Sequence, residues 1–118
     1  MAVANLDTNK INGAYNTVNV ADLTAFDGTA GAEYTPEKGD ERVMVVIYNS
    51  DASNAEDVTI KAPKNPSKIG GAIADVKVSV GAGKIAMVMV ESAKFVDEET
   101  GKVTLAGSAD VKAAVFQM

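Results

Sequence analysis

The sequence predicts an all-β protein: a single β-sandwich, jelly-roll or immunoglobulin-like, of about eight strands with an irregular N-terminal arm. Three observations lead to this prediction. Short segments of β-forming residues recur along most of the chain, separated by turn residues. One of them, Asp75–Val80, alternates strictly between valine and polar residues, as expected of a half-buried strand whose Val76, Val78 and Val80 face the core. The 118 residues are 47% hydrophobic with only three Tyr and three Phe, which indicates one domain with an aliphatic core.

The N-terminal segment, residues 1–16, is expected to be an arm, and residues 17–118 the sandwich domain. The arm carries isolated apolar side chains, Val3, Leu6 and Ile11, with no sustained strand or helix period. The first strand of the sandwich is expected within Thr17–Phe26, where Val18 and Val20 alternate with polar residues. A turn-rich segment follows.

The middle of the chain contains two further strand signals. Val43–Tyr48 is a continuous run of β-forming apolar residues, and after a polar loop Asp57–Ala62 alternates between apolar and polar positions. The segment Pro63–Ala74 contains two Pro and two adjacent Gly. It is therefore expected to cross from one sheet to the other.

The last third of the chain is predicted to form hairpins. Gly81-Ala82-Gly83 should make a tight hairpin turn, since glycine adopts the positive φ angles that such turns require. A second hairpin is expected from Lys94–Val96 to Lys102–Leu105 through the loop DEETG, and Val111–Phe116 is expected to be the final strand. The pattern favours no helix.

Two of the predicted strands are apolar at every position, whereas a strand of a solvated sandwich usually has one polar face. If Val43, Val45 and Ile47 face the core, alternate residues of that strand face outward. In the second strand, Ile85, Met87 and Met89 are taken as inward and Ala86, Val88 and Val90 as outward. The arm, the Pro63–Ala74 crossing, neighbouring subunits or a ligand could cover these outward faces. The residues predicted to form an interface are Val3, Leu6, Ile11, Met44, Val46, Tyr48, Val88 and Val90.

The composition excludes several classes of site. There is no His, Cys or Trp, which excludes His- and Cys-ligated zinc, haem and iron–sulfur sites, disulfides, a Cys nucleophile and a Ser-His-Asp triad. The net charge of −5 and the single Arg disfavour a nucleic-acid partner. No run approaches the roughly 20 apolar residues of a membrane span, and residues 1–10 lack the pattern of a secretory signal. We expect no cofactor, nucleic acid or membrane.

Acidic groups are the only candidates for catalysis or metal binding. Asp97, Glu98 and Glu99 are consecutive in a hairpin tip, where they diverge and do not form the opposed pair of a glycosidase. Asp51, Glu56 and Asp57 flank a loop and could bind Ca²⁺ weakly, but without EF-hand spacing. We therefore predict neither an enzyme nor a metal site.

The second half of the chain resembles a known family. RVMVVIYNSDASNAEDVTIKAP, DVKVSVGAGK and ESAKFVDEETGKVTLAGSADVKAAVFQM, together covering roughly Arg42 to Met118, resemble small β-sandwich capsid decoration (auxiliary or cement) proteins of tailed bacteriophages. The family pattern often has Gly-Pro where this chain has Val90-Glu91, and Pro where Gly81 stands.

The resemblance implies a structural virion protein, made in the host cytoplasm, that docks on the capsid surface. Its partner would be the phage major capsid protein, and it would be a homo-oligomer, with a trimer favoured. A flexible terminal arm would reach a neighbouring subunit. The alternative is a carbohydrate-binding or adhesin-like module, although such modules commonly stack sugars on exposed aromatic side chains and this chain has no Trp.

Overall fold

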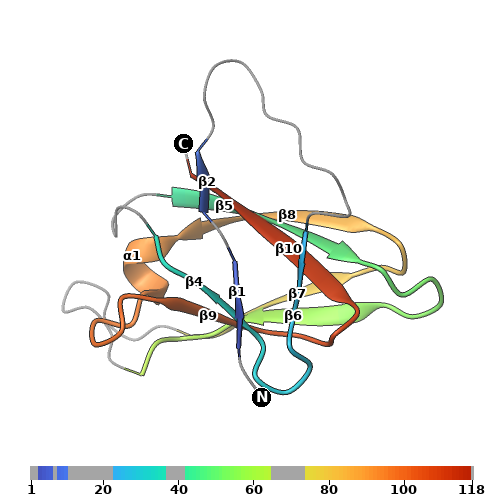
Figure 1. The fold of residues 1–118 in the computed structure, drawn as a ribbon, viewed down its shortest axis with the longest axis horizontal. Helices are drawn as coiled ribbons and strands as arrows, with labels where there is room; N and C mark the ends of the chain where they lie inside the picture. The colour runs from blue at the N-terminus through green and yellow to red at the C-terminus, as the bar shows by residue number, and fades with distance from the viewer. Residues whose placement is uncertain (1–2, 7, 11–22, 37–41, 65–73, 118) are drawn as a thin grey trace.

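The computed structural model describes residues 3–6, 8–10, 23–36, 42–64 and 74–117. These residues form ten strands in two sheets and one short helix, α1 (Ser92–Phe95). Sheet A contains, in spatial order, β1 (Ala4–Asn5), β4 (Ala32–Tyr34), β9 (Val103–Ala106), β6 (Glu56–Ile60) and β7 (Val76–Val80). Sheet B contains β2 (Thr8–Lys10), β10 (Val111–Gln117), β5 (Arg42–Asn49) and β8 (Ile85–Glu91), and β3 (Thr24–Ala25) also pairs with β10. The predicted all-β sandwich is confirmed (Figure 1).

The order of the strands is that of a jelly roll. From β3 onward the first strand pairs with the last, β3 with β10, and this rule continues inward: β4 pairs with β9, β5 with β8 and β6 with β7, all antiparallel. The chain is thus a long antiparallel ribbon that rolls up, and the β5–β10 and β6–β9 pairs complete the two sheets. Of the two sandwich types that the sequence left open, the structure has the jelly roll.

The N-terminal residues join both sheets. β1 pairs in parallel with β4 in sheet A, and β2 pairs in parallel with β10 in sheet B. β2 and β3 divide the outer edge of β10 between them, with β3 beside Lys112 and Ala113 and β2 beside Val115 to Gln117. Within the segment expected to be an irregular arm, Ala4–Asn5 and Thr8–Lys10 are therefore short strands, whereas Val3 and Leu6 lie outside them.

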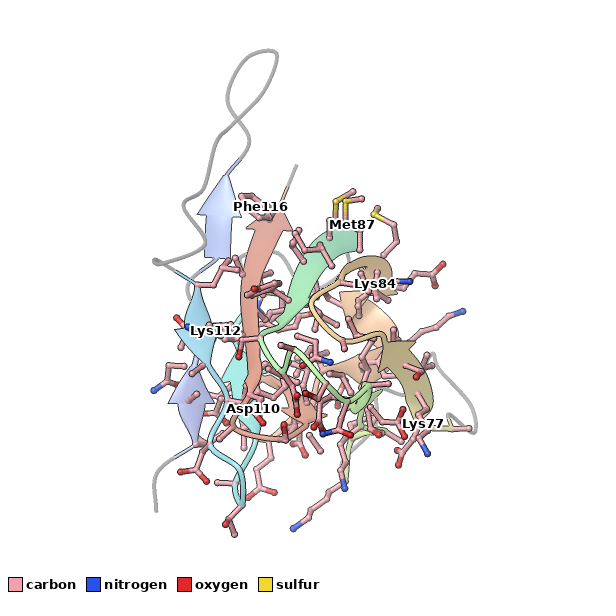
Figure 2. The ribbon with its side chains drawn as sticks, turned by 90° about the vertical axis from the view of Figure 1, so that its right-hand side faces the viewer. Lys77, Lys84, Met87, Asp110, Lys112 and Phe116 are labelled. Carbon is pink, nitrogen blue, oxygen red and sulfur yellow. The ribbon has the colours of Figure 1, made fainter. Side chains whose placement is uncertain are left out.

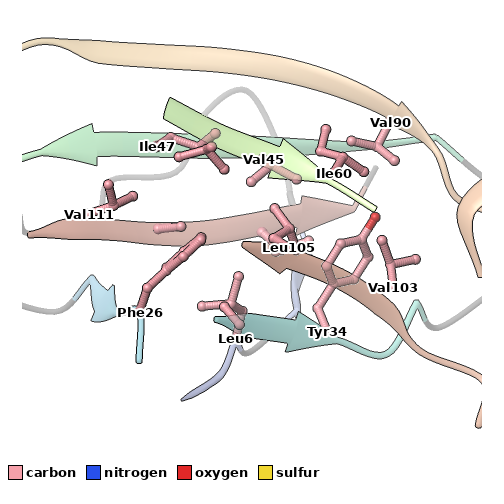
Figure 3. Close-up of a cluster of buried hydrophobic side chains, with 14 of the residues drawn as sticks. Leu6, Phe26, Tyr34, Val45, Ile47, Ile60, Val90, Val103, Leu105 and Val111 are labelled. Atoms are coloured by element: carbon pink, nitrogen blue, oxygen red, sulfur yellow. The ribbon is translucent and has the colours of Figure 1, made fainter. Parts of the chain in front are cut away.

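The core lies between the sheets and is aliphatic, as the composition predicts. Inward side chains of β5, β9 and β10 alternate with outward ones, as the two-residue period of a strand requires. Val43, Val45 and Ile47 face inward and are fully buried, as predicted from the sequence. Figure 3 shows the cluster, whose buried members include Leu6, Phe26, Tyr34, Val45, Ile47, Ile60, Val90, Val103, Leu105 and Val111.

Two buried polar groups connect elements across the core. The side chain of Asn49, at the end of β5, donates from Nδ2 to the carbonyl oxygens of Asn54 (2.9 Å) and Val80 (3.1 Å). Its Oδ1 accepts from the amide of Asp51 at 3.0 Å. The hydroxyls of Tyr34 and Ser92 lie 3.4 Å apart and join β4 to α1. Both groups satisfy the requirement that buried polar atoms find a hydrogen-bond partner.

A tight turn leads into β4. The carboxylate of Asp27 accepts hydrogen bonds from the amides of Thr29 (2.9 Å) and Ala30 (2.8 Å). The turn ends at Gly31, which has a φ of +79° and whose added Cβ would overlap the carbonyl oxygen of Leu105. Only glycine fits this position, because both the backbone angle and the close approach of β9 exclude a side chain.

Several connections differ from the prediction. Gly81-Ala82-Gly83 is a turn, but β7 and β8 lie in different sheets, so it crosses the sandwich and does not close a hairpin. Conversely, the connection containing Pro63–Ala74 joins β6 and β7, which are neighbours within sheet A. These two segments exchange their expected roles because turn composition does not encode which strands pair.

Two smaller predictions also fail. The segment expected as the strand Lys94–Val96 begins within helix α1, and the loop after it is closed by a hydrogen bond from the amide of Asp97 to the carbonyl of Lys102 (2.9 Å). Val76 was expected to face the core with Val78 and Val80 but is 41% exposed. Of the predicted first strand, Thr17–Phe26, the part before Leu23 lies outside the described residues.

Candidate docking surface

The outer face of sheet B is apolar across the middle of β5, β8 and β10, and the next outward position of β8 beyond this part is the charged Glu91. The register of β5 with its neighbours β8 and β10 aligns three rows of outward side chains. Eight of these nine side chains are apolar, and Lys112 at one corner is the exception. The rows are Phe116–Met44–Met89, Ala114–Val46–Met87 and Lys112–Tyr48–Ile85.

The exposure of this face, which we call the sheet B face, increases toward β8. Met87 is 69% exposed, Ile85 54% and Met89 47%. The side chains from β5 and Phe116 of β10 are half-buried, and Ala114 is buried. In Figure 2 Met87 and Phe116 lie at the same end of the sandwich, on the strands that flank β5. A contiguous apolar surface of this kind usually marks an interaction site.

Of the predicted interface residues, three lie on the sheet B face: Met44, Val46 and Tyr48. The two predicted from β8 do not. Val90 is 2% exposed and belongs to the core, and Val88 is half-buried and packs against the core. The orientation predicted for β8 is therefore wrong, and its outward residues are Ile85, Met87 and Met89.

The three predicted interface residues of the N-terminal segment have different positions in the structure. Leu6 is 4% exposed and is part of the core cluster, so it is not available to a partner. Val3 is half-buried. Ile11 lies outside the described residues.

The hydrophobic pattern of β8 does not show which of its two sets of alternate residues faces the core, because residues 85–90 are all apolar and both sets are equally suited to burial. The informative residue is Glu91, the last residue of β8, which is only half-buried and paired with Lys94 at 3.0 Å. A charged side chain at the end of the strand belongs on the solvent face, and alternate residues from Glu91 are Met89, Met87 and Ile85. Phe116 and Ala114 were missed because strand register is not visible in the sequence.

Three carboxylates gather at one end of the sandwich. Oxygen atoms of Asp51, Glu56 and Asp110 lie within 4.8 Å of one another. Two of these residues, Asp51 and Glu56, belong to the loop considered for Ca²⁺, whereas Asp57 pairs with Lys77 at 3.2 Å. Hydrogen bonds from the amides of Ser53 and Asn54 lower the pKa of Asp51 and occupy its Oδ1. Among the described residues nothing beyond the carboxylates themselves indicates an ion here.

A pocket of about 280 Å³ lies on the other side of the molecule, at the outer face of sheet A. Phe95 of α1 is its one aromatic lining residue. Charged side chains surround it, including an ion pair between Lys102 and Glu33 at 3.0 Å. The remaining lining residues are Lys61, Ala62, Pro63, Lys64, Asp97, Thr100 and Thr104.

Comparison with known proteins identifies no relative: no family model, no curated protein and no solved structure matches the chain. Within the part of the chain that the structure describes, no helix is long and apolar enough to cross a membrane.

Proposed function

We propose that the protein is a structural virion protein that docks through the sheet B face onto the major capsid protein of a tailed phage and reinforces or decorates the shell, without catalysis. The observation that carries this proposal is the three-by-three array of outward side chains, of which only Lys112 is charged. The resemblance of residues 42–118 to phage decoration proteins supplies the identity of the partner.

The chemistry of the sheet B face suits a protein partner. Removing apolar side chains from water favours association by about 25 cal/mol per Å². Three of the eight apolar residues are methionines, Met44, Met87 and Met89, whose flexible thioether side chains adapt to the surface that they meet. The face offers few groups that could hydrogen-bond to a sugar or a phosphate.

The size of the sheet B face suits a repeated binding site. With strands about 4.8 Å apart and same-face residues about 6.8 Å apart, nine positions cover on the order of 300 Å². A standard protein interface buries roughly 800 Å² per partner. A capsid lattice presents many equivalent sites, and multivalent engagement increases the overall affinity without additional contacts at any one site.

The second candidate is a carbohydrate-binding module, and the pocket on sheet A favours it. There Phe95, which is half-buried and also packs against the core, is accompanied by charged and hydroxyl side chains, among them Thr100 and Thr104, so that an aromatic side chain and polar groups line one pocket. This function would use the opposite side of the molecule from the sheet B face, so one experiment can separate the two.

The test measures co-sedimentation of the protein with capsid shells assembled without it. Val46 lies at the centre of the sheet B face, so Val46→Lys places a charge in the apolar contact. We expect it to abolish co-sedimentation at concentrations where the unmodified protein saturates the shells. The control is Ser79→Lys, which adds the same charge at an exposed position of β7 in the other sheet, and we expect it to bind normally.

The result has a clear interpretation when the thermal unfolding of both variants is measured alongside. A Val46→Lys protein that is folded and does not bind supports the proposal. Equal binding by the two variants, or retention of the unmodified protein on glycan columns without binding to shells, would contradict it. In the second case Phe95→Ala should abolish glycan retention.

A further inference from the structure

The two sides of the sandwich differ in how the edges of the sheets are covered. On one side the N-terminal strands cover both edges: β1 pairs with β4, and β2 and β3 together cover β10. On the other side lie β7 and β8, each of which pairs, among the described strands, only with its inner neighbour. An uncovered edge strand presents backbone N–H and C=O groups with which another strand can pair.

The edge strand β7 has a feature that discourages such pairing, whereas β8 has none. β7 is five residues long and carries Lys77, whose side chain is 68% exposed; an edge lysine is a common protection against strand addition. β8 is seven residues long with the sequence IAMVMVE and contains no Lys, Pro or Gly. Its register with β5 runs without a bulge from Glu91 to Ile85.

The hydrogen bonds of β8 identify which backbone groups face the open edge. The amide of Asn49 donates to the carbonyl of Lys84 at 3.0 Å, so Lys84 directs its carbonyl toward β5. Hydrogen-bonding direction alternates along an antiparallel strand. Ala86, Val88 and Val90 therefore also bond to β5, and the N–H and C=O groups of Ile85, Met87 and Met89 point to the edge.

We propose that β8 is a dimerisation edge: a second copy of this chain adds its own β8 in antiparallel orientation about a two-fold axis at Val88. In this arrangement Val88 lies opposite the partner's Val88, and Met87 lies opposite the partner's Met89. Met87 and Met89, whose backbone N–H and C=O groups point to the edge, then lie opposite each other and can exchange hydrogen bonds between the two copies. The two B sheets become one continuous sheet.

The sequence of β8 suits pairing with itself. From Ile85 to Val90 it carries no charge, so no like charges oppose each other. The charged residue of the strand, Glu91, lies opposite the partner's Ile85 and not opposite another acid. Pairing of one edge with itself is an isologous contact that closes after two copies, so the edge predicts a dimer, whereas the family resemblance implies a trimer.

The dimer would also enlarge the surface assigned to docking. A two-fold axis perpendicular to the sheet keeps both B faces on the same side. The most exposed residues, Ile85, Met87 and Met89, would lie at the centre of the joined surface and not at its margin. The apolar surface available to a capsid site would be roughly twice the area of about 300 Å² that the sheet B face of one copy covers.

Cysteine cross-linking tests the pairing directly, because the chain has no cysteine of its own. Residues opposite each other in a non-hydrogen-bonded antiparallel pair have Cα atoms about 4.5 Å apart, which is within the range that a disulfide spans. Val88→Cys is therefore expected to form a disulfide-linked dimer under mild oxidation. The control is Lys77→Cys on β7, which is equally an edge strand and is expected to stay monomeric on a non-reducing gel.

Light scattering after size exclusion supplies the second measurement. The unmodified protein is expected to be a dimer, and Met87→Pro a folded monomer. The Met87 N–H points to the edge, so proline removes a bond to the partner and none to β5. A monomer or a trimer of the unmodified protein, or cross-linking of both cysteine variants to the same extent, would overturn the proposal.

This test separates the dimer from the docking function. Val46 lies on β5, one strand away from the edge, so Val46→Lys should remain a dimer while losing capsid binding. If Val46→Lys binds capsids normally but Met87→Pro is monomeric, docking is wrong and the dimer stands. If Met87→Pro and the unmodified protein are both monomers and Val46→Lys still loses capsid binding, the dimer is wrong and docking through the sheet B face stands.

Discussion

At the scale of single residues, Asn49 is the clearest link between the two sheets. It ends β5 in sheet B, is fully buried, and donates to the carbonyl of Val80, the last residue of β7 in sheet A. It also holds the loop that follows it, through the carbonyl of Asn54 and the amide of Asp51. The sequence indicates only that an apolar run ends here, because asparagine is a common turn residue and its identity does not show which backbone groups its side chain bonds.

We predict that Asn49→Ala lowers the free energy of unfolding by about 2–4 kcal/mol, because it leaves the buried carbonyl of Val80 and the part-buried carbonyl of Asn54 and amide of Asp51 without their partner. Urea unfolding followed by circular dichroism measures this. The control is Asn54→Ala, an exposed residue whose side chain makes one bond of 3.4 Å to Asp51, and it should cost less than about 1 kcal/mol. Equal losses in the two variants would contradict the role given to Asn49.

At the scale of elements, the two short N-terminal strands could not be placed from the sequence. β1 has two residues and β2 three, which is too short to show a period of two. Their positions are determined by tertiary contacts, through the burial of Leu6 and the pairing with β4 and β10. The longer strands were predicted closely: Val43–Tyr48 lies within β5, and Val111–Phe116 lies within β10.

The role of the N-terminal strands in the core gives a prediction for Leu6. Leu6→Ala should destabilise the protein by about 2–5 kcal/mol, the cost of a cavity at a buried leucine. A freely attached arm would lose almost nothing. Val3→Ala, at a half-buried position, is the comparison and should cost less. Thermal unfolding by calorimetry measures both, and an unchanged midpoint for Leu6→Ala would show that this segment does not contribute to the core in solution.

At the scale of the whole molecule, the absence of His and Cys determines how stability responds to pH. Those are the side chains whose ordinary pKa values lie nearest neutrality, so no side chain with an ordinary pKa is expected to change stability by titrating between about pH 6 and 8. At the acidic end, hydrogen bonds from the amides of Ala30 and Thr29 lower the pKa of Asp27 below its ordinary 3.8. Its contribution, like that of Asp51, is present above this value and is lost as the pH falls below it.

At the alkaline end, the prediction concerns Tyr34. Burial raises its pKa from 10.0 to about 12, against a smaller opposing effect of the hydrogen bond with Ser92. The folded state therefore favours the neutral phenol. Its contribution is complete below about pH 10 and should be lost between about pH 10 and 12, amounting to about 2–3 kcal/mol. Urea unfolding at stepped pH measures the loss, and Tyr34→Phe should remove this part of the slope. If Tyr34→Phe loses as much stability between about pH 10 and 12 as the unmodified protein, the role given to Tyr34 is contradicted.

The pairing of the first and last strands of the roll has a consequence for synthesis. β10 is an interior strand of sheet B, with β5 on one side and β2 and β3 on the other. Until Val111–Gln117 has left the ribosome, β5 has no partner on that side and β2 and β3 have no strand to join. The pairing of β10 with β2 and β3 also forms slowly, because these strands lie far apart in the sequence. Sheet B should therefore form only after translation has reached the C-terminal strand, and nascent chains halted before it should be sensitive to proteases.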